Sequence, residues 1–307
     1  MKISVVIPVF NSDKTITNLV DGILSNLKKH NIEHEIILID DGSTDSSWKE
    51  LEKLSHQNLN VRSLKLLKNY GQHTANLCGF KNSEGTTIIT MDDDLQNPPS
   101  EIIKLIEEID KGFDLVYGVY IAKQHGLIRG LGSKIVTRLN KRIFDIKGEF
   151  PLSNFRAVSR EVIERVINEA SSRPYIPGLI LKNSDTISTV KVNHDERREG
   201  KSRYTLPKLI SLVLDLLFQH SNIPLRLISI FGFAVSLTSF ILGGYILFDA
   251  LFNETDSLPG WSSLAVLISF LGGMLILSIS VIGEYLIRIL RQLPQNKIYT
   301  LVKVINK

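Results

Sequence analysis

The first part of the chain alternates short apolar runs with amphipathic stretches. The runs rich in Val, Ile and Leu, typical of strands buried on both faces, are residues 3–9, 35–39, 61–67 and 86–91. Helical spacing recurs over residues 12–29, a polar helix is expected before the third run, and residues 74–82 are predicted to be helical. Strands that alternate with helices predict an α/β fold with a mostly parallel sheet, whose ligand site lies at the carboxyl ends of the strands.

The composition changes near Pro224. Over residues 225–252 the only charged side chains are Arg226 and Asp249, and residues 262–282 carry no charge. Each run has the roughly 20 apolar residues that a helix needs to cross a bilayer. The pattern predicts a two-helix transmembrane hairpin, with a pair of buried core helices as the alternative.

Charged residues around the two runs predict their orientation. The connector 253–260 carries Glu254 and Asp256 but no Lys or Arg, whereas the outer flanks are basic. The positive-inside rule therefore places both termini in the cytoplasm. The predicted segments are a cytoplasmic domain (1–204), an interfacial helix (205–223), a first span (224–252), an external loop (253–261), a second span (262–290) and a cytoplasmic tail (291–307).

The overall composition narrows the class of protein. The chain has 307 residues, a net charge of +4, and 43% hydrophobic against 22% charged residues, which is enough for a buried core. The modest charge argues against a nucleic-acid partner and is compatible with a membrane surface or a phosphate-bearing substrate. A single cysteine, Cys78, excludes a disulfide scaffold and fits a reducing compartment. The N-terminus leads directly into an apolar strand, without a signal-peptide pattern.

Three adjacent carboxylates follow the fourth predicted strand directly. Asp92, Asp93 and Asp94 repel one another, so placing them together costs stability unless a cation neutralises them. Asp92 and Asp94 point to the same side of an extended backbone, and Gln96 adds a neutral oxygen. The cluster predicts a divalent cation, Mg²⁺ or Mn²⁺, bound by carboxylates. An acidic turn with capping aspartates is the alternative.

The usual glycine-rich phosphate motifs are missing from this sequence, so a nucleotide diphosphate would need such a cation as its partner. Asp40 and Asp41 end the second strand and are expected to line the same crevice as the acidic cluster. A carboxylate there can accept hydrogen bonds from the imide of a uracil ring, and a turn with a helix cap is the alternative. His73, in the polar loop 69–73, is a base, a substrate contact or a packed histidine.

Two basic segments suggest contact with phosphates or membrane headgroups. Residues 127–144 combine an apolar stripe with Lys and Arg, as in helices that lie on anionic membranes, and a solvated helix face is the alternative. Residues 194–204 form a mixed-charge loop that could clamp phosphates or be a plain surface loop. Residues 205–220 carry one apolar face and predict an interfacial helix that leads into the first span.

Taken together, the motifs resemble glycosyltransferase family 2, and within it the polyprenyl-phosphate glycosyltransferases. The segments that carry the resemblance are residues 6–11, 40–43, 69–73, 92–96, 129 with 133, 155–156, 200–204 and the double span after 224–226. Dolichol-phosphate mannose synthase is of this kind, and residues 69–73 and 94–99 are most similar to the bacterial undecaprenyl-phosphate formamido-arabinose transferase type. The resemblance covers almost the whole chain.

The resemblance implies a GT-A, Rossmann-like catalytic domain in the bacterial inner membrane. It implies inverting, metal-dependent transfer of a sugar, carried by UDP, to undecaprenyl phosphate for cell-envelope glycans such as lipopolysaccharide. The residues it assigns to the nucleotide are Pro8, Phe10, Asn11, Asp40, Asp41 and Asp92. Those it assigns to the metal are Asp92, Asp94 and Gln96, which act in catalysis with Arg129. Those it assigns to the acceptor phosphate are Arg129, Ser133, Arg197, Arg198, Lys201 and Arg203.

Departures from the family pattern keep some questions open. Ser12 stands where many relatives have Glu, and Tyr120 stands where relatives often have Arg, with Lys123 the nearest basic substitute. A processive polysaccharide synthase would need a Gln-x-x-Arg-Trp motif, and neither Trp48 nor Trp261 lies in one. A non-catalytic membrane scaffold is the remaining rival. The transferred sugar and the oligomeric state, a homo-oligomer included, are not fixed by these motifs.

Overall fold

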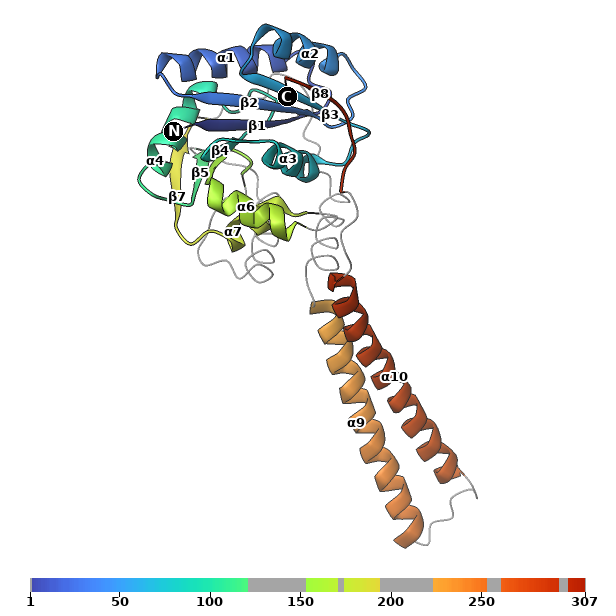
Figure 1. Cartoon of the computed structure of the whole chain (residues 1–307). Coiled ribbons are helices and arrows are strands. Elements are labelled where there is room, and N and C mark those ends of the chain that lie inside the picture. Colours follow the sequence, from blue (N-terminus) through green and yellow to red (C-terminus); the bar gives the residue numbers. More distant parts are fainter. Residues whose placement is uncertain are drawn as a thin grey trace. The chain divides into compact units, whose positions relative to one another are not determined.

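The computed structural model describes residues 2–120, 153–170, 174–193, 223–252, 261–292 and 298–306. The chain divides into two compact units, of which the first comprises Met1–Arg203 together with Gln295–Lys307 and the second Tyr204–Pro294. Each unit is described by itself below, and both are drawn in Figure 1. The predicted interfacial helix at 205–223 lies almost entirely outside the described residues.

The first unit is built on an eight-stranded sheet in the order β7-β5-β6-β4-β1-β2-β3-β8. Its strands are β1 (Ile3–Val9), β2 (His34–Asp40), β3 (Val61–Leu66), β4 (Thr87–Thr90), β5 (Leu115–Tyr120), β6 (Arg156–Ser159), β7 (Ile187–Val192) and β8 (Leu301–Ile305). Strand β1 pairs in parallel with β2 and β4, β2 with β3, and β5 with β7. Strand β6 is antiparallel to both of its neighbours, and β8 is antiparallel to β3. The prediction of a mostly parallel α/β sheet is confirmed.

Helices cover both faces of this sheet (Figure 1). They are α1 (Ile16–Lys29), α2 (Ser47–Gln57), α3 (Gln72–Lys81), the short 3₁₀ helix η1 (Pro99–Glu101), α4 (Ile102–Ile109), α6 (Arg160–Glu169) and α7 (Ile176–Lys182). Every residue of β1 is buried, so both faces of this strand are covered, as its apolar run predicts.

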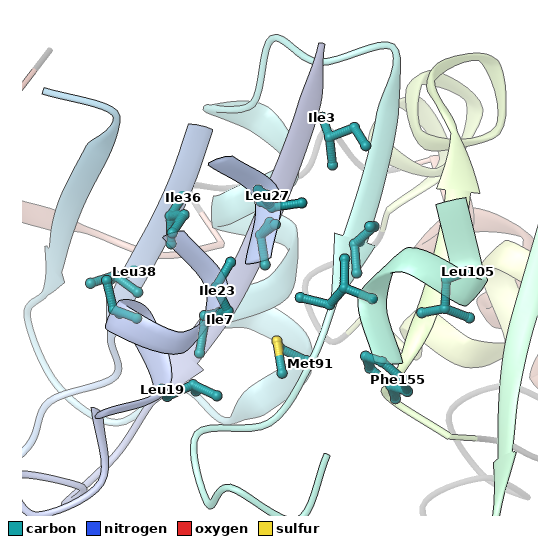
Figure 2. Packing of buried hydrophobic residues seen from close by; sticks show 14 of the residues in the cluster. Ile3, Ile7, Leu19, Ile23, Leu27, Ile36, Leu38, Met91, Leu105 and Phe155 are labelled. Carbon is teal, nitrogen blue, oxygen red and sulfur yellow. The ribbon is translucent and has the colours of Figure 1, made fainter. Parts of the chain in front are cut away.

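Alternate residues of β1 belong to two separate cores. Ile7 packs with Leu19 and Ile23 of α1 on one face, a cluster shown in Figure 2. Val6 packs on the other face, with the cluster that includes Leu77 of α3. This is the two-residue alternation of a strand, in which successive side chains point to opposite faces. The sheet therefore packs against a hydrophobic cluster on each face, and the polar loops lie at the ends of its strands.

Strand β8 was not found from the sequence, which placed residues 291–307 in a tail. The side-chain amide of Asn306 donates to the carbonyl oxygens of Val61 (2.8 Å) and Asn58 (3.3 Å), and Arg62 Nε donates to the carbonyl oxygen of Asn306 (2.9 Å). The run is short, and its partner β3 lies more than two hundred residues earlier, so local periodicity gives no sign of the pairing. The C-terminal residues cover the β3 edge of the sheet.

In its described residues, the second unit has two long helices, α9 (Ile223–Phe252) and α10 (Trp261–Gln292). They pack closely where Gly273 faces Ser236, since a Cβ on Gly273 would lie 3.0 Å from Ser236 Oγ. The rings of Phe240 and Phe270 meet edge to face, with centroids 5.1 Å apart. Both predicted apolar runs are therefore helical.

Large apolar side chains face outward along both helices of the second unit. Phe231 is 71% exposed and Tyr245 is 67% exposed, whereas Leu59, Leu67, Val302 and Val304 are the exposed large apolar residues in the described part of the first unit. Among the residues that the structure describes, no helix meets the combined requirements of length and apolar character for crossing a membrane.

Replacing Gly79 with alanine is expected to destabilise the first unit by about 1–3 kcal/mol, the usual cost of overpacking a core. Gly79 brings α3 against the sheet, and a Cβ there would lie 2.3 Å from Val6 Cγ1 and 2.9 Å from Ile39 Cδ1. The measurement is urea unfolding followed by tryptophan fluorescence. Gly244→Ala in α9 is the matched control, because nothing lies within 4 Å of its added methyl group. Equal midpoints for Gly79→Ala and the wild type would contradict the close approach of α3 to the sheet.

Candidate active site

The loop after β4 carries the acidic cluster, and its central carboxylate is turned toward the end of β1. Asp93 Oδ2 accepts hydrogen bonds from the backbone N–H of Phe10 (3.0 Å) and from Ser12 Oγ (2.5 Å). Thr15 Oγ1 donates to the carbonyl oxygen of Asp93 (2.7 Å). Burial raises the pKa of Asp93, and these donors oppose the shift. Asp93 thus joins the ends of two neighbouring strands, β1 and β4.

Asp92 is held by two side-chain amides through one of its oxygens. Its Oδ1 accepts from Gln72 Nε2 (2.6 Å), at the start of α3, and from Asn154 Nδ2 (2.9 Å), just before β6. Burial, with the charge of Asp94 as a second cause, raises the pKa of Asp92 to about 6. An ionised Asp92 is therefore costly in the isolated protein, and a cation beside it would relieve that cost.

Asp94 and Gln96 flank a residue in an unusual backbone conformation. Leu95 has φ of +60°, a region that bulky side chains rarely adopt, and its side chain packs against the core beneath the loop. The turn is closed by the Gln96 N–H, which donates to Asp94 Oδ1 (3.1 Å). Asp94 and Gln96 thus lie on either side of a strained residue, on the same short loop as Asp92.

The oxygen donors of this loop fit a divalent cation in kind, since carboxylate and amide oxygens suit Mg²⁺ and Mn²⁺. Within the described ranges, no cluster of three or more His, Cys, Asp or Glu side chains is arranged to hold a metal ion. The assignment of Asp92, Asp94 and Gln96 as metal ligands stays a prediction.

Asp41 organises the polar loop that follows β3. Its Oδ1 accepts from the backbone N–H of Tyr70 (2.7 Å) and its Oδ2 from that of Gly71 (2.9 Å). Burial raises the pKa of Asp41, with the two N–H donors opposing the shift. Asp41 therefore holds this loop in place, and its direct contact with a nucleotide stays a prediction.

Asp40 is fully buried at the end of β2. Its Oδ1 accepts from the Ser43 N–H (3.0 Å), while its Oδ2 has no hydrogen-bond partner among the described residues. A buried carboxylate oxygen without a donor is costly, so this loop is not optimised for stability alone.

The loops after β1 and β2 are hydrogen-bonded to each other. Asn11 has φ of 54°, its side-chain oxygen accepts from the Thr44 N–H (2.8 Å), and its own N–H donates to Ser43 Oγ (3.1 Å). Pro8 is buried within β1, whereas Phe10 is partly exposed and Asn11 is exposed. The residues predicted for the nucleotide therefore gather at one edge of the sheet, at the carboxyl ends of β1, β2 and β4.

Contacts of three further polar residues at this edge were not predicted from the sequence, and one of the three, Asn154, was not identified there at all. Tyr120 ends β5, and its hydroxyl donates to Asn97 Oδ1 (2.9 Å) beside the acidic loop. The ring of His73 packs edge-on against Tyr175, with centroids 5.3 Å apart, which agrees with the alternative of a packed histidine. Asn154 lies next to the motif at 155–156, and that proximity was the one signal that could have pointed to it.

The residues predicted for the acceptor phosphate lie outside the described part of the chain. They are Arg129, Ser133, Arg197, Arg198, Lys201 and Arg203. Also outside the described part are Lys123, the predicted amphipathic segment 127–144 and the mixed-charge loop 194–204. Their roles stay predictions.

Replacing Asp92 with asparagine is expected to stabilise the protein in the presence of a chelator at neutral pH. Because the pKa of Asp92 is about 6 in the folded state, against an ordinary value of 3.8, the folded protein holds this proton more tightly than the unfolded chain. Stability contributed by Asp92 therefore falls as the pH rises through this window, and the full cost stands above about pH 6. Asparagine keeps an oxygen for the two amide donors and carries no charge.

Thermal unfolding midpoints at about pH 4 and about pH 7.5 test this prediction, with the gain confined to the higher pH. Asp114→Asn is the matched control. Burial alone would raise the pKa of Asp114, but donors from Thr186 and Asp185 outweigh it and lower the pKa, so Asp114→Asn should destabilise at neutral pH. A midpoint for Asp92→Asn below that of the wild type at the higher pH would show that the Asp92 charge is stabilising.

Comparison with known proteins shows which family this chain resembles. Residues 4–167 match the model of glycosyl transferase family 2. The chain is 33% identical over 310 residues to the undecaprenyl-phosphate 4-deoxy-4-formamido-L-arabinose transferase of Proteus mirabilis, covering 99% of this chain and 94% of that protein. It is 34% identical over 310 residues to the transferase of the same name from Klebsiella pneumoniae, covering 100% of this chain and 94% of that protein.

Solved structures share the fold. Glucosyl-3-phosphoglycerate synthase from Mycobacterium tuberculosis, in complex with Mn²⁺, UDP-glucose and glycerol 3-phosphate, aligns with a TM-score of 0.53 at 19% identity, covering 72% of this chain and 80% of that chain. A second complex of that enzyme, with Mn²⁺, UDP-glucose and phosphoglyceric acid, gives 0.51 at 21% identity, covering 70% and 77%. The GT-A-like architecture expected from the motifs is confirmed. The chain therefore belongs to glycosyltransferase family 2, and it is a glycosyltransferase.

Proposed function

We propose that this protein transfers a sugar from a nucleotide-sugar to undecaprenyl phosphate, giving a lipid-linked monosaccharide. The observation that carries the proposal is the acidic loop after β4. In this loop Asp93 bonds to the end of β1, while Asp92 and Asp94 lie beside it at the carboxyl end of β4. The full-length relatives are named undecaprenyl-phosphate transferases, which supports the acceptor. Their sugar, 4-deoxy-4-formamido-L-arabinose, is one candidate for the donor panel.

The donor would lie at the carboxyl ends of β1, β2 and β4. The residues proposed to surround the nucleotide are Pro8, Phe10, Asn11, Asp40 and Asp41. The hydrogen bonds between the loops after β1 and β2 support this proposal, because they hold both loops in place. UDP is proposed as the carrier, on the resemblance of the motifs. The structure of an enzyme of the same fold contains Mn²⁺ and UDP-glucose. We propose that this chain binds a divalent cation and a UDP-sugar in the same way.

Asp92, Asp94 and Gln96 would hold the divalent cation, Mg²⁺ or Mn²⁺. Such a cation neutralises the charge that develops on a departing diphosphate. The raised pKa of Asp92, caused first by burial, supports this role, since a carboxylate that is costly to ionise gains most from a neighbouring positive charge. Gln96 lies within two residues of Asp94 and offers a neutral oxygen.

The chemical step is proposed to be a direct, inverting displacement. A phosphate oxygen of the lipid attacks the anomeric carbon as the bond from that carbon to the nucleotide diphosphate breaks, and the electron pair leaves with the diphosphate. A phosphate monoester has its second pKa near ~6 and is largely ionised at neutral pH, so no strong general base is needed. Arg129 and Ser133 would orient the acceptor phosphate and reduce repulsion between two anionic substrates, with Arg197, Arg198, Lys201 and Arg203 nearby.

The second unit is proposed to lie in the bacterial inner membrane, with the catalytic domain and both termini in the cytoplasm. The charge-free stretch between Arg226 and Asp249 supports this location, as does a second stretch from Trp261 to Gly283. The outward apolar side chains of α9 and α10 need an environment other than water, and lipid provides it for a protein whose acceptor is itself a lipid.

Asp94→Ala is expected to lower sugar transfer by more than about a hundredfold, because carboxylate ligands hold the ion that stabilises the leaving group. The purified full-length protein in detergent would be incubated with undecaprenyl phosphate, Mn²⁺ or Mg²⁺ and a panel of nucleotide-sugars, and the glycolipid identified by mass spectrometry. Asp21→Ala, at an exposed position of α1, is the matched control and should keep full activity. Transfer that persists in Asp94→Ala, or in a chelator, would overturn the metal assignment.

Membrane topology gives an independent prediction. A cysteine at position 256, in the connector between the helices, should react with a membrane-impermeant maleimide in intact spheroplasts. Lys111→Cys, in the catalytic domain, should react only after the membrane is opened. The native Cys78 is buried, and burial raises its pKa to about 12, so it should stay silent in both experiments. Labelling of position 111 from outside would contradict the proposed orientation.

A further inference from the structure

A layer of buried polar side chains, formed by Arg156, Tyr117 and Asn76, is linked to the acidic loop through Asn154. Arg156, the first residue of β6, is 1% exposed, and its guanidinium contacts neutral oxygens, with NH1 at 3.4 Å from the Ser153 carbonyl and NH2 at 3.5 Å from Asn154 Oδ1. Its Nε has no hydrogen-bond partner among the described residues. A buried guanidinium with such long contacts is expensive, so its presence calls for a reason other than stability.

Further buried polar atoms of the same layer also lack hydrogen bonds of regular geometry. Tyr117 of β5 is opposite Arg156 in the strand register, and its buried hydroxyl interacts with the Arg156 side chain without a hydrogen bond of regular geometry. Asn76 of α3 is 1% exposed, and its Oδ1 has no hydrogen-bond partner among the described residues. Unsatisfied buried groups of this kind are rare in proteins and tend to gather at functional sites.

Asn154 connects this layer to Asp92. Its Oδ1 accepts from Asn76 Nδ2 (2.9 Å) and faces the guanidinium of Arg156 (3.5 Å). Its backbone carbonyl accepts from Thr90 Oγ1 (2.5 Å). With donors on its oxygen side, the amide can present only its NH₂ group to the other side, where Nδ2 donates to Asp92 Oδ1 (2.9 Å).

In this arrangement the two carboxylate oxygens of Asp92 have different surroundings. Oδ1 receives both Gln72 and Asn154, whereas the described residues place no hydrogen bond on Oδ2. A carboxylate held through one oxygen by two amides has its side-chain rotation fixed, and its second oxygen is aimed in one direction. The polar layer therefore has a geometric consequence at the acidic loop.

We infer that Asn154 is a positioning residue, which fixes Asp92 so that its second oxygen can ligate the divalent cation, and that Arg156 and Asn76 set the orientation of Asn154. This inference rests on the proposed function, because it needs Asp92 to be a metal ligand. Partners behind a metal ligand typically change metal affinity 10–100-fold when they are replaced.

Asn154→Leu tests the inference with no change in charge and with the branching at Cγ kept. In the full-length protein in detergent with saturating UDP, the Kd for Mn²⁺, measured from the electron paramagnetic resonance signal of free Mn²⁺, should rise about 10–100-fold. Asn183→Leu is the matched control. Asn183 is also partly buried and donates to the Leu179 carbonyl (3.0 Å), so its loss lowers stability without touching the acidic loop, and its Kd should equal that of the wild type.

Arg156→Met provides a second test, in which two explanations give opposite signs. Removing a positive charge near Asp92 would tighten Mn²⁺ binding if charge alone mattered. If Arg156 orients Asn154, Mn²⁺ binding should weaken instead. Replacing a buried charge by an apolar side chain of similar size is often neutral for stability, so this variant should fold even where Asn154→Leu does not. Thermal unfolding midpoints would confirm that each variant is folded.

Asp92→Ala separates failure of this inference from failure of the proposed function. If Asp92→Ala binds Mn²⁺ and UDP as the wild type does, the metal assignment itself is wrong. If Asp92→Ala loses Mn²⁺ while folded Asn154→Leu or Arg156→Met retains the wild-type Kd or binds more tightly, the positioning role is overturned and the proposed function stands. Weaker binding in both variants, with Asn183→Leu unchanged, is the expected result.

Discussion

The parallel pairing of β1 with β2 on one side and β4 on the other is the constraint from which the core and the candidate site both follow. Its register aligns Val9 with Asp40 and Val6 with Thr90, so the loops after three strands emerge at one edge. Parallel strands buried on both faces must be apolar along their length, which confines polar side chains to the strand ends. Asp93 then joins two of these ends through its bonds to Phe10 and Ser12.

The acidic residues at this edge divide into two groups with different physical roles. Asp41 and Asp93 accept backbone N–H donors and hold loops in place, so they are part of the fold. Asp92 is held by side-chain amides through a single oxygen, and burial makes its ionised form costly. Stability would favour a neutral residue at that position. The carboxylate at position 92 lowers stability, and so do the strained Leu95 and the unsatisfied atoms around Arg156. Such destabilising features are expected to gather at functional sites.

The far edge of the sheet is protected by the last residues of the chain. Strand β8 covers β3 and carries Lys303, which pairs with Glu52 at 2.5 Å, and a charged residue on an edge strand opposes pairing with other molecules. Because β8 follows α10 in sequence, the residues on either side of the two-helix unit both belong to the catalytic domain. The chain therefore enters and leaves that unit from the same domain.

The sequence by itself determined the strands β1 to β4, the helices around them, the two long apolar helices and the position of the acidic cluster. These follow from side-chain spacing within a few residues, which is set by the geometry of each element. Only the tertiary structure decided that β6 runs antiparallel between β4 and β5, that β8 returns to the sheet, that Asp93 turns inward, and that Asn154 reaches Asp92. Those contacts join residues far apart in the chain, and they depend on strand order and register, which no local pattern specifies.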